Sequence, residues 1–153
     1  MTLEWLIIGG GIQGVHLAAR LIGEAGIDPS ELRIVDPAER LLERWSTVTA
    51  TTGMSHLRSP VVHHLALDPW SLKRFATKGK KKSGVFAPPH NRPRLALFNA
   101  HCTKVIDRFG LSDLHVRARA EHCLVEASGV CVELSSGIKV KARNVLLAIG
   151  SSE

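Results

Sequence analysis

Tyrosine is absent from this sequence of 153 residues, and the other aromatic residues are few, with four Phe and three Trp. Proteins that bind single-stranded nucleic acid stack the bases on aromatic side chains, which are scarce here. The net charge of +6 would still attract nucleic acid. The densest basic run, Lys78 to Lys82, lies among Gly and Ser residues and is expected to be a solvated loop. We therefore do not expect nucleic acid as a partner, and binding through this run is kept as a third hypothesis.

Cysteine is also scarce, and the three cysteines, Cys102, Cys123 and Cys131, form no CxxC pair. This pattern argues against a disulfide scaffold, a zinc site and disulfide-reductase chemistry, so we expect buried thiols. The adjacent His63 and His64 have no further ligand at metal spacing. No metal site is expected.

Long apolar runs are missing as well, since none approaches the ~20 residues of a membrane-spanning helix. The N-terminus lacks the basic segment followed by an apolar one that marks a secretory signal. We therefore expect a cytoplasmic protein that does not contact membranes. The length and a hydrophobic fraction of 44% indicate one globular domain with its own core.

The first 36 residues follow the pattern strand, glycine turn, helix, strand. Leu3 to Ile8 is a short apolar run, and residues 13–25 carry an apolar stripe at helical spacing, with Gly26 as the stop. A second apolar run, "LRIVD", ends at Asp36. This order predicts two parallel strands joined by a right-handed crossover.

The middle of the chain predicts three further helical segments separated by loops. They cover 38–45, 68–76 and 95–109, where Asp68 is the expected N-cap of the second and Gly110 stops the third. Long loops are expected over 46–60 and 78–93.

Beyond Gly110 the apolar period changes to two. Four strand-like runs, at 114–120, 122–128, 130–136 and 138–150, predict a β-meander that ends in a buried strand, Val145 to Ile149. The expected fold class is α/β, a Rossmann-like parallel sheet with a β-meander.

Three glycines after the first strand, Gly9, Gly11 and Gly14, match the pattern GxGxxG. Gly9 allows a tight turn, Gly11 lets the backbone approach a pyrophosphate, and Gly14 lets the helix pack closely on the strand. The N–H groups at the helix start, including those of Ile12 and Gln13, would point at the phosphates. This spacing predicts a dinucleotide site, with a purely structural βα turn as the alternative.

An acidic residue supports the dinucleotide prediction. Asp36 ends the second strand, 22 residues after Gly14, and is followed by Pro37. A carboxylate there can accept hydrogen bonds from both hydroxyls of an adenosine ribose, and its charge disfavours a 2′-phosphate. Asp36 and Pro37 are therefore candidate cofactor-binding residues.

The glycine motif, the acidic strand end and the terminal "NVLLAIGSS" resemble the flavoproteins that have two dinucleotide-binding domains. The middle segment, "RWSTVTATTGMSHLRSPVVHHLALDPWSLKRFA", is similar to the flavin-dependent N-hydroxylating monooxygenases of the lysine and ornithine type and to related FAD/NAD(P)-binding oxidoreductases. The resemblance implies FAD as the cofactor and NAD(P)H-dependent monooxygenation of a small amine or similar nucleophile. The alternative is a non-catalytic NAD- or FAD-binding module with a regulatory role.

The resemblance also implies cofactor contacts in the middle segment. Trp45 would lie beside the flavin ring and Arg44 near a phosphate, with ordinary packing and solvation as the alternatives. The loop that contains Met54, His56 and Arg58 would face the isoalloxazine.

Three residues near the end complete the implied site. Ala120 would lend its backbone to the adenine, and Ala148 and Gly150 would carry the terminal motif past the flavin. No catalytic residue is assigned, because a reduced flavin itself supplies the chemistry of oxygen activation.

The sequence departs from the resembled enzymes in length, after Met54, and in the terminal motif, which reads Ala148-Ile149-Gly150 where Ala-Thr-Gly is commoner. They are more than twice as long and carry a second nucleotide fold for NADPH or NADH. We therefore expect residues 1–153 to be a single FAD-binding domain, the N-terminal portion of a longer flavoprotein, with self-association left open. A small-molecule substrate would bind only to the complete enzyme. Its identity does not carry over, because Ser55 follows Met54 where ornithine hydroxylases have Gln.

Overall fold

A six-stranded sheet forms the base of the molecule, with the strand order β5-β2-β1-β8-β7-β6. The computed structural model describes residues 2–62, 65–77 and 85–150. The parallel strands are β1 (Thr2–Ile8), β2 (Leu32–Asp36), β5 (His115–Arg117) and β8 (Lys139–Leu147). The antiparallel strands β7 (Gly129–Leu134) and β6 (Ala120–Glu126) extend the sheet beyond β8. The predicted fold class, a Rossmann-like parallel sheet with a β-meander, is confirmed.

The N-terminal βαβ unit forms as the sequence pattern predicts. Helix α1 (Ile12–Gly23) connects β1 to β2, which pair in parallel with Ile7 opposite Ile34. The small residues Gly14, Ala18 and Ala19 are buried on α1, which lets the helix lie close to the sheet. The chain then passes through a short 3₁₀ turn, η1 (Pro29–Glu31), into β2.

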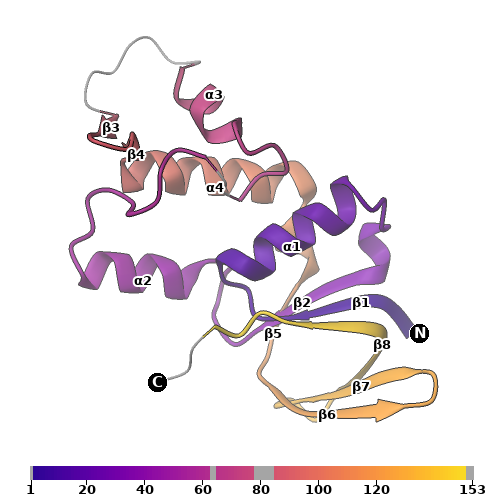
Figure 1. Cartoon of the computed structure of the whole chain (residues 1–153). Coiled ribbons are helices and arrows are strands. Elements are labelled where there is room, and N and C mark those ends of the chain that lie inside the picture. Colours follow the sequence, from indigo (N-terminus) through magenta and orange to yellow (C-terminus); the bar gives the residue numbers. More distant parts are fainter. Residues whose placement is uncertain (1, 63–64, 78–84, 151–153) are drawn as a thin grey trace.

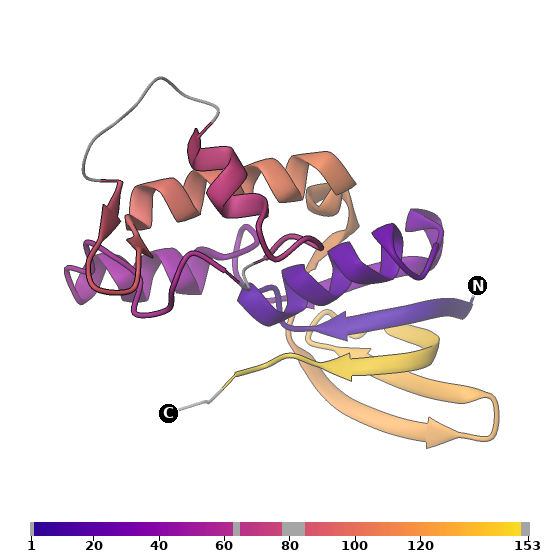
Figure 2. The ribbon, with the colours of Figure 1, turned by 45° about the horizontal axis from the view of Figure 1, so that its top comes forward.

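A long crossover leads from β2 to β5 and carries the other helices. Its elements are α2 (Glu43–Thr51), α3 (Ser71–Thr77), the short hairpin β3 (Phe86–Ala87) and β4 (Arg92–Pro93), α4 (Leu95–Phe109) and the 3₁₀ turn η2 (Leu111–Leu114). Helices α1 to α4 lie on one side of the parallel strands, while the β6–β7 ribbon curls beneath the other side (Figures 1 and 2).

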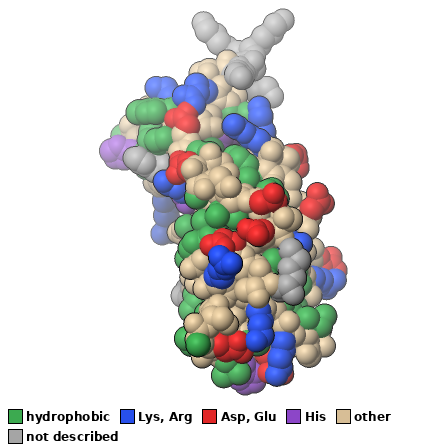
Figure 3. All heavy atoms as spheres, turned by 90° about the vertical axis from the view of Figure 1, so that its right-hand side faces the viewer, with side chains coloured by type: hydrophobic (Ala, Val, Ile, Leu, Met, Phe, Trp, Pro, Cys, Tyr) green, Lys and Arg blue, Asp and Glu red, His purple; other side chains and the backbone are tan. Residues whose placement is uncertain are grey.

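The two sides of the sheet have separate cores. The first core is formed by Ile7, Ile34 and the buried faces of the helices. The second core lies on the other side of the parallel strands, against the meander, around Leu6, Val35 and Val132. No helix in the described part of the chain is both long enough and apolar enough to cross a bilayer. Basic and acidic side chains are interspersed on the face drawn in Figure 3, which carries no continuous patch of one sign.

The prediction of a loop over 46–60 is wrong in its first half, because α2 continues to Thr51. The Thr- and Ser-rich sequence is accommodated by hydroxyls that bond to carbonyls one turn back. Thr49 is buried, and its Oγ1 donates to the Trp45 carbonyl at 2.8 Å. The expected helical turns at 38–45 correspondingly start later, at Glu43.

The helix expected over 68–76 also starts late, at Ser71. The Asp68 side chain accepts a hydrogen bond from the Trp70 N–H at 2.9 Å, which forms a turn ahead of the helix. The loop expected over 78–93 contains the β3–β4 hairpin. The Lys78 to Lys82 run and the His63–His64 pair lie outside the described residues.

The predicted four-run meander has three strands, because β5 leaves it and pairs with β2 at the opposite edge of the sheet. The terminal strand is also less buried than expected. Leu147 is 67% exposed and Ile149 is 61% exposed, whereas Leu146 and Ala148, which alternate with them, pack against the core on the helix side.

Candidate functional site

The glycine turn lies where the carboxyl ends of β1, β2 and β8 meet. Gly9 has a φ of +115° and donates its N–H to the Val35 carbonyl at 2.8 Å. A Cβ at Gly9 would overlap the carbonyl oxygen of Ala148, and a Cβ at Gly14 would overlap the carbonyl oxygen of Gly9. Neither position can take a side chain, because the atoms in the way belong to the backbone.

Gly11 differs from the other two glycines of the pattern because the space beside it is open. A Cβ there would meet nothing within 4 Å. Gly11 is the N-cap of α1, and neither a capping side chain nor an acidic residue covers the first turn. The first N–H groups of a helix lack intrahelical partners, so this turn faces open space with hydrogen-bond donors and a positive dipole end, which suits an anion.

The carboxylate of Asp36 is fixed beside this turn. Its Oδ2 accepts from the Gly10 N–H at 2.6 Å, and its Oδ1 accepts from the Ala38 N–H at 2.9 Å. Each carboxylate oxygen can accept a further hydrogen bond, so both retain capacity for hydroxyl groups of a ligand. The structure also assigns Gly10 a role that the pattern leaves open. A Cβ there would lie 2.9 Å from Leu41 Cδ2 and 3.1 Å from Asp36 Cβ.

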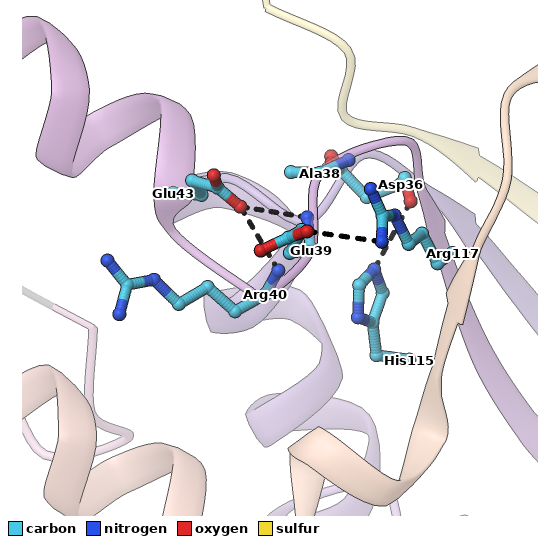
Figure 4. A network of polar contacts seen from close by, with 7 residues as sticks. All are labelled: Asp36, Ala38, Glu39, Arg40, Glu43, His115 and Arg117. Atoms are coloured by element: carbon cyan, nitrogen blue, oxygen red, sulfur yellow. Dashed lines mark hydrogen bonds and ion pairs between the residues drawn. The ribbon is translucent and has the colours of Figure 1, made fainter.

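The backbone of Asp36 is held by β5 (Figure 4). The Asp36 carbonyl accepts from His115 Nε2 and from the Ala118 N–H, both at 3.2 Å. Because a carbonyl oxygen only accepts, His115 carries its proton on Nε2. These two bonds join the end of β2 to the first residue of β5 and to the residue that follows β5, and they thereby hold the backbone that carries the carboxylate.

A second group of contacts orders the segment after β2 (Figure 4). Glu43 at the start of α2 reaches back, and its Oε2 accepts from the N–H groups of Glu39 at 2.8 Å and Arg40 at 3.3 Å. Arg117 at the end of β5 forms an ion pair with Glu39 at 3.3 Å. Both side chains are mostly exposed, so this ion pair contributes little to the stability of the segment at the edge of the site.

A cavity of about 520 Å³ lies beside the first turns of α1. Its walls come from α1, α2, the segment after α2 and α4, and are mostly apolar. The lining residues are Ile12, Gln13, His16, Trp45, Met54, Leu57, Arg58, Ser59, Leu65 and Phe98. Its size and apolar walls with a few polar groups match those of small-molecule sites in general.

Trp45 is held in this wall by two contacts. Its Nε1–H donates to Asn99 Oδ1 at 3.1 Å, and its ring meets Phe98 edge to face, with the centroids 5.5 Å apart. Both partners lie on α4, so α4 fixes the orientation of a side chain that belongs to α2.

The structure brings most of the expected site residues together. Gly9, Gly11, Gly14 and Asp36 form the turn with its carboxylate, Pro37 follows directly, and Ala148 packs against Gly9. The cavity beside α1 is lined by Ile12, Gln13, Trp45, Met54 and Arg58.

Four expected residues lie elsewhere. Arg44 is exposed on the first turn of α2, and His56 pairs with Arg94 in an isolated bridge outside the cavity wall. Ala120 begins β6 opposite Leu134, and the Asp36 carbonyl is contacted instead by His115 of β5 and by Ala118, which follows β5. Gly150, two residues after Ala148, has a φ of +67°, and a Cβ there would meet nothing within 4 Å.

Sequence reasoning missed five of the lining residues: His16, Leu57, Ser59, Leu65 and Phe98. His16 carried a usable signal, because it follows Ile12 by four residues and therefore shares its helix face. Phe98 had none, since its place in the wall depends on how α4 packs against α2.

The expectation of buried thiols is confirmed for Cys102 and Cys131 and is wrong for Cys123, which is exposed on β6. Burial raises the pKa of the Cys102 thiol to about 12, which keeps it protonated and unreactive at neutral pH. Within 2–62, 65–77 and 85–150, no three His, Cys, Asp or Glu side chains group as they would around a metal ion.

The family of this chain follows from a sequence comparison. The model of the FAD-NAD(P)-binding family matches residues 6–152. The chain belongs to the FAD-NAD(P)-binding family. Comparison with curated proteins found no match. The family agrees with the glycine turn and the fixed carboxylate, and it confirms the expected resemblance to FAD/NAD(P)-binding oxidoreductases.

Solved flavin monooxygenases share the fold of the FAD/NAD(P)-binding domain. A flavin-containing monooxygenase from Stenotrophomonas maltophilia is 19% identical with a TM-score of 0.58, and the match covers 96% of this chain and 38% of that one. OTEMO in complex with FAD and NADP is 16% identical with a TM-score of 0.62, covering 99% and 26%. Cyclohexanone monooxygenase is 16% identical with a TM-score of 0.58, covering 97% and 26%. The chain thus spans well under half the length of these structures.

Proposed function

We propose that this domain binds FAD in an extended form between Asp36 and the cavity beside α1. The observation that carries the proposal is the open space at Gly11, which faces the uncapped first turn of α1 and adjoins a fixed carboxylate. The pyrophosphate would lie on that turn, and the adenosine ribose would bond to Asp36. The residues present therefore fit the cofactor.

The flavin end of the cofactor would enter the cavity. Trp45, Met54 and Phe98 give it flat apolar surface, while Gln13 and Arg58 bring hydrogen-bond donors. Arg44, His56, Ala120 and Gly150 have no assigned contact with FAD in this arrangement. In the complete protein, the flavin would serve NAD(P)H-dependent monooxygenation of a small molecule, and this chain would supply its binding and orientation.

A titration of the purified chain with ligands tests the placement. We expect FAD to bind more tightly than ADP, because FAD fills both halves of the site, and ADP more tightly than ADP carrying a 2′-phosphate. Isothermal calorimetry would measure all three. Equal affinities for FAD and ADP would contradict the entry of the flavin into the cavity, and preference for the 2′-phosphate would contradict the role of Asp36.

The second candidate function is a nucleotide-binding module without catalysis. It is favoured because the described residues contain one glycine turn that could bind a pyrophosphate. In the ranges that the structure describes, only the turn at Gly9–Gly11 joins a parallel strand to a helix through glycines. Hydride transfer needs a nicotinamide held about 3–3.5 Å from the flavin. We therefore expect no rapid flavin bleaching when the FAD-loaded chain meets excess NADPH without oxygen. Rapid, saturable bleaching would place a complete reduction site within this chain or a self-associated form of it.

A further inference from the structure

The ring of His16 in the cavity wall is oriented by a backbone carbonyl. Its Nδ1 lies 2.9 Å from the carbonyl oxygen of Leu65. A carbonyl oxygen can only accept, so His16 carries its proton on Nδ1. In the neutral imidazole the other nitrogen, Nε2, then holds a lone pair and is a hydrogen-bond acceptor.

His16 is part of the cavity wall. It follows Ile12 by four residues on α1, and both line the cavity together with Gln13. His16 is half-buried, and the remaining polar lining groups are Gln13, Arg58 and Ser59. None of the lining residues carries a carboxylate. When the His16 ring is neutral, its Nε2 is the side-chain nitrogen of the lining that accepts a hydrogen bond and cannot donate one.

The rest of the lining complements this acceptor. Arg58 donates only, and the Gln13 amide can donate as well. A flat ring that presents one N–H between two carbonyl groups would match this wall, since the N–H needs an acceptor and the carbonyls need donors. The pyrimidine portion of the flavin ring has this pattern, whereas ADP lacks it.

We propose that His16, held by the Leu65 carbonyl, recognises the flavin ring by accepting a hydrogen bond from its imide N–H at Nε2. The proposal rests on the proposed function, because it requires the flavin end of FAD to occupy this cavity. His16 is then a specificity-determining residue for the ring, and it does not take part in binding the adenosine half.

The test pairs a change in the protein with a change in the ligand. The ligands are FAD and FAD methylated at the imide nitrogen, which has lost the donor. The proteins are the parent chain, His16→Ala and His16→Gln, whose side-chain oxygen is a replacement acceptor. We expect the parent to prefer FAD about 2- to 13-fold, which is the ratio that a hydrogen bond of ordinary strength produces. The preference should vanish in His16→Ala and partly return in His16→Gln.

ADP is the control ligand, and all three proteins should bind it equally if the variants fold. An equal preference for FAD in the parent and in His16→Ala, with ADP binding intact, would overturn the role of His16 and leave the proposed function standing. Failure of the parent to bind FAD more tightly than ADP would instead overturn the proposed function and this inference with it.

A measurement on the ligand-free chain tests the same inference without FAD. Nitrogen-15 NMR of the histidine side chains distinguishes the two neutral tautomers. We expect His16 to carry its proton on Nδ1 at a pH where the ring is neutral. A proton on Nε2 would overturn the inference, because the ring could then not accept from the flavin.

Discussion

The two ends of the candidate site are formed by different parts of the chain, backbone groups at one end and side chains at the other. The Asp36 end consists of backbone groups and one carboxylate, drawn from the glycine turn and the segment after β2, and it is braced by β5. The cavity end consists of side chains from α1, α2, α4 and the segment after α2. Backbone atoms cannot move aside for an added group, whereas side chains can repack. The Asp36 end should therefore respond sharply to small changes that the cavity end tolerates.

The largest effect on binding is expected from Gly11→Val. A Cβ at this position would meet nothing within 4 Å in the free chain, so the fold should be kept, but the side chain occupies the space where the phosphates would lie. Titration should detect no binding of FAD or ADP at concentrations that saturate the parent, while urea unfolding stays unchanged. Gly14→Ala is the matched contrast. Its Cβ overlaps the Gly9 carbonyl, so we expect a loss of about 1–3 kcal/mol or more in the free energy of unfolding.

A smaller but still large effect is expected from Asp36→Ala. The variant loses the charge-assisted bond to the ribose, so FAD and ADP should both weaken by about 1.5–3 kcal/mol, roughly 10- to 150-fold in Kd. The N–H of the buried Gly10 also loses its acceptor, which should lower the free energy of unfolding by about 1–3 kcal/mol. Fluorescence titration and urea unfolding measure the two effects. Unchanged affinity would mean that the carboxylate serves only the turn.

Trp45→Leu should weaken binding at the cavity end and leave binding at the Asp36 end unchanged. The substitution removes the edge-to-face contact with Phe98 and the bond to Asn99, and it reduces the flat wall of the cavity. We expect FAD to weaken by about 1 kcal/mol, in the range of an aromatic contact, and ADP to be unaffected. An equal loss for both ligands, measured by calorimetry, would show that the cavity and the Asp36 end are not independent.

The smallest effect is expected from Arg117→Ala. The ion pair with Glu39 joins two side chains that are 63% and 70% exposed, where water and salt screen the attraction. Such pairs contribute about 0–1 kcal/mol, so FAD affinity should change less than about fivefold. A change as large as that of Asp36→Ala, persisting in high salt, would mean that Arg117 touches the ligand itself.

The Asp36 end was largely predictable because its signals are local. The glycine spacing follows from the turn geometry, and Asp36 follows from the length of one βαβ unit. Two features escaped prediction even there. Gly10 matters because Leu41 and the Asp36 side chain pack against it, and His115 matters because β5 pairs with β2 at a distance of 79 residues along the chain.

The cavity end was predicted only where the family resemblance named residues. Trp45, Met54 and Arg58 were expected near the flavin and do line the cavity, but the helix that presents Trp45 was expected to stop before Thr51. A Thr-rich run has weak helix propensity, and the hydroxyl bonds that support α2 become visible only in the folded chain.

By itself, the sequence determined the βαβ unit, the glycine turn, the acidic strand end and the helix over 95–109, because each depends on residues a few positions apart. The tertiary structure decided that β5 leaves the meander, that Trp45 is held by α4, and that His16 faces a cavity with its tautomer set by Leu65. These outcomes depend on contacts between segments far apart in the chain. Which segments meet is decided by the joint burial of apolar faces, and no local pattern encodes it.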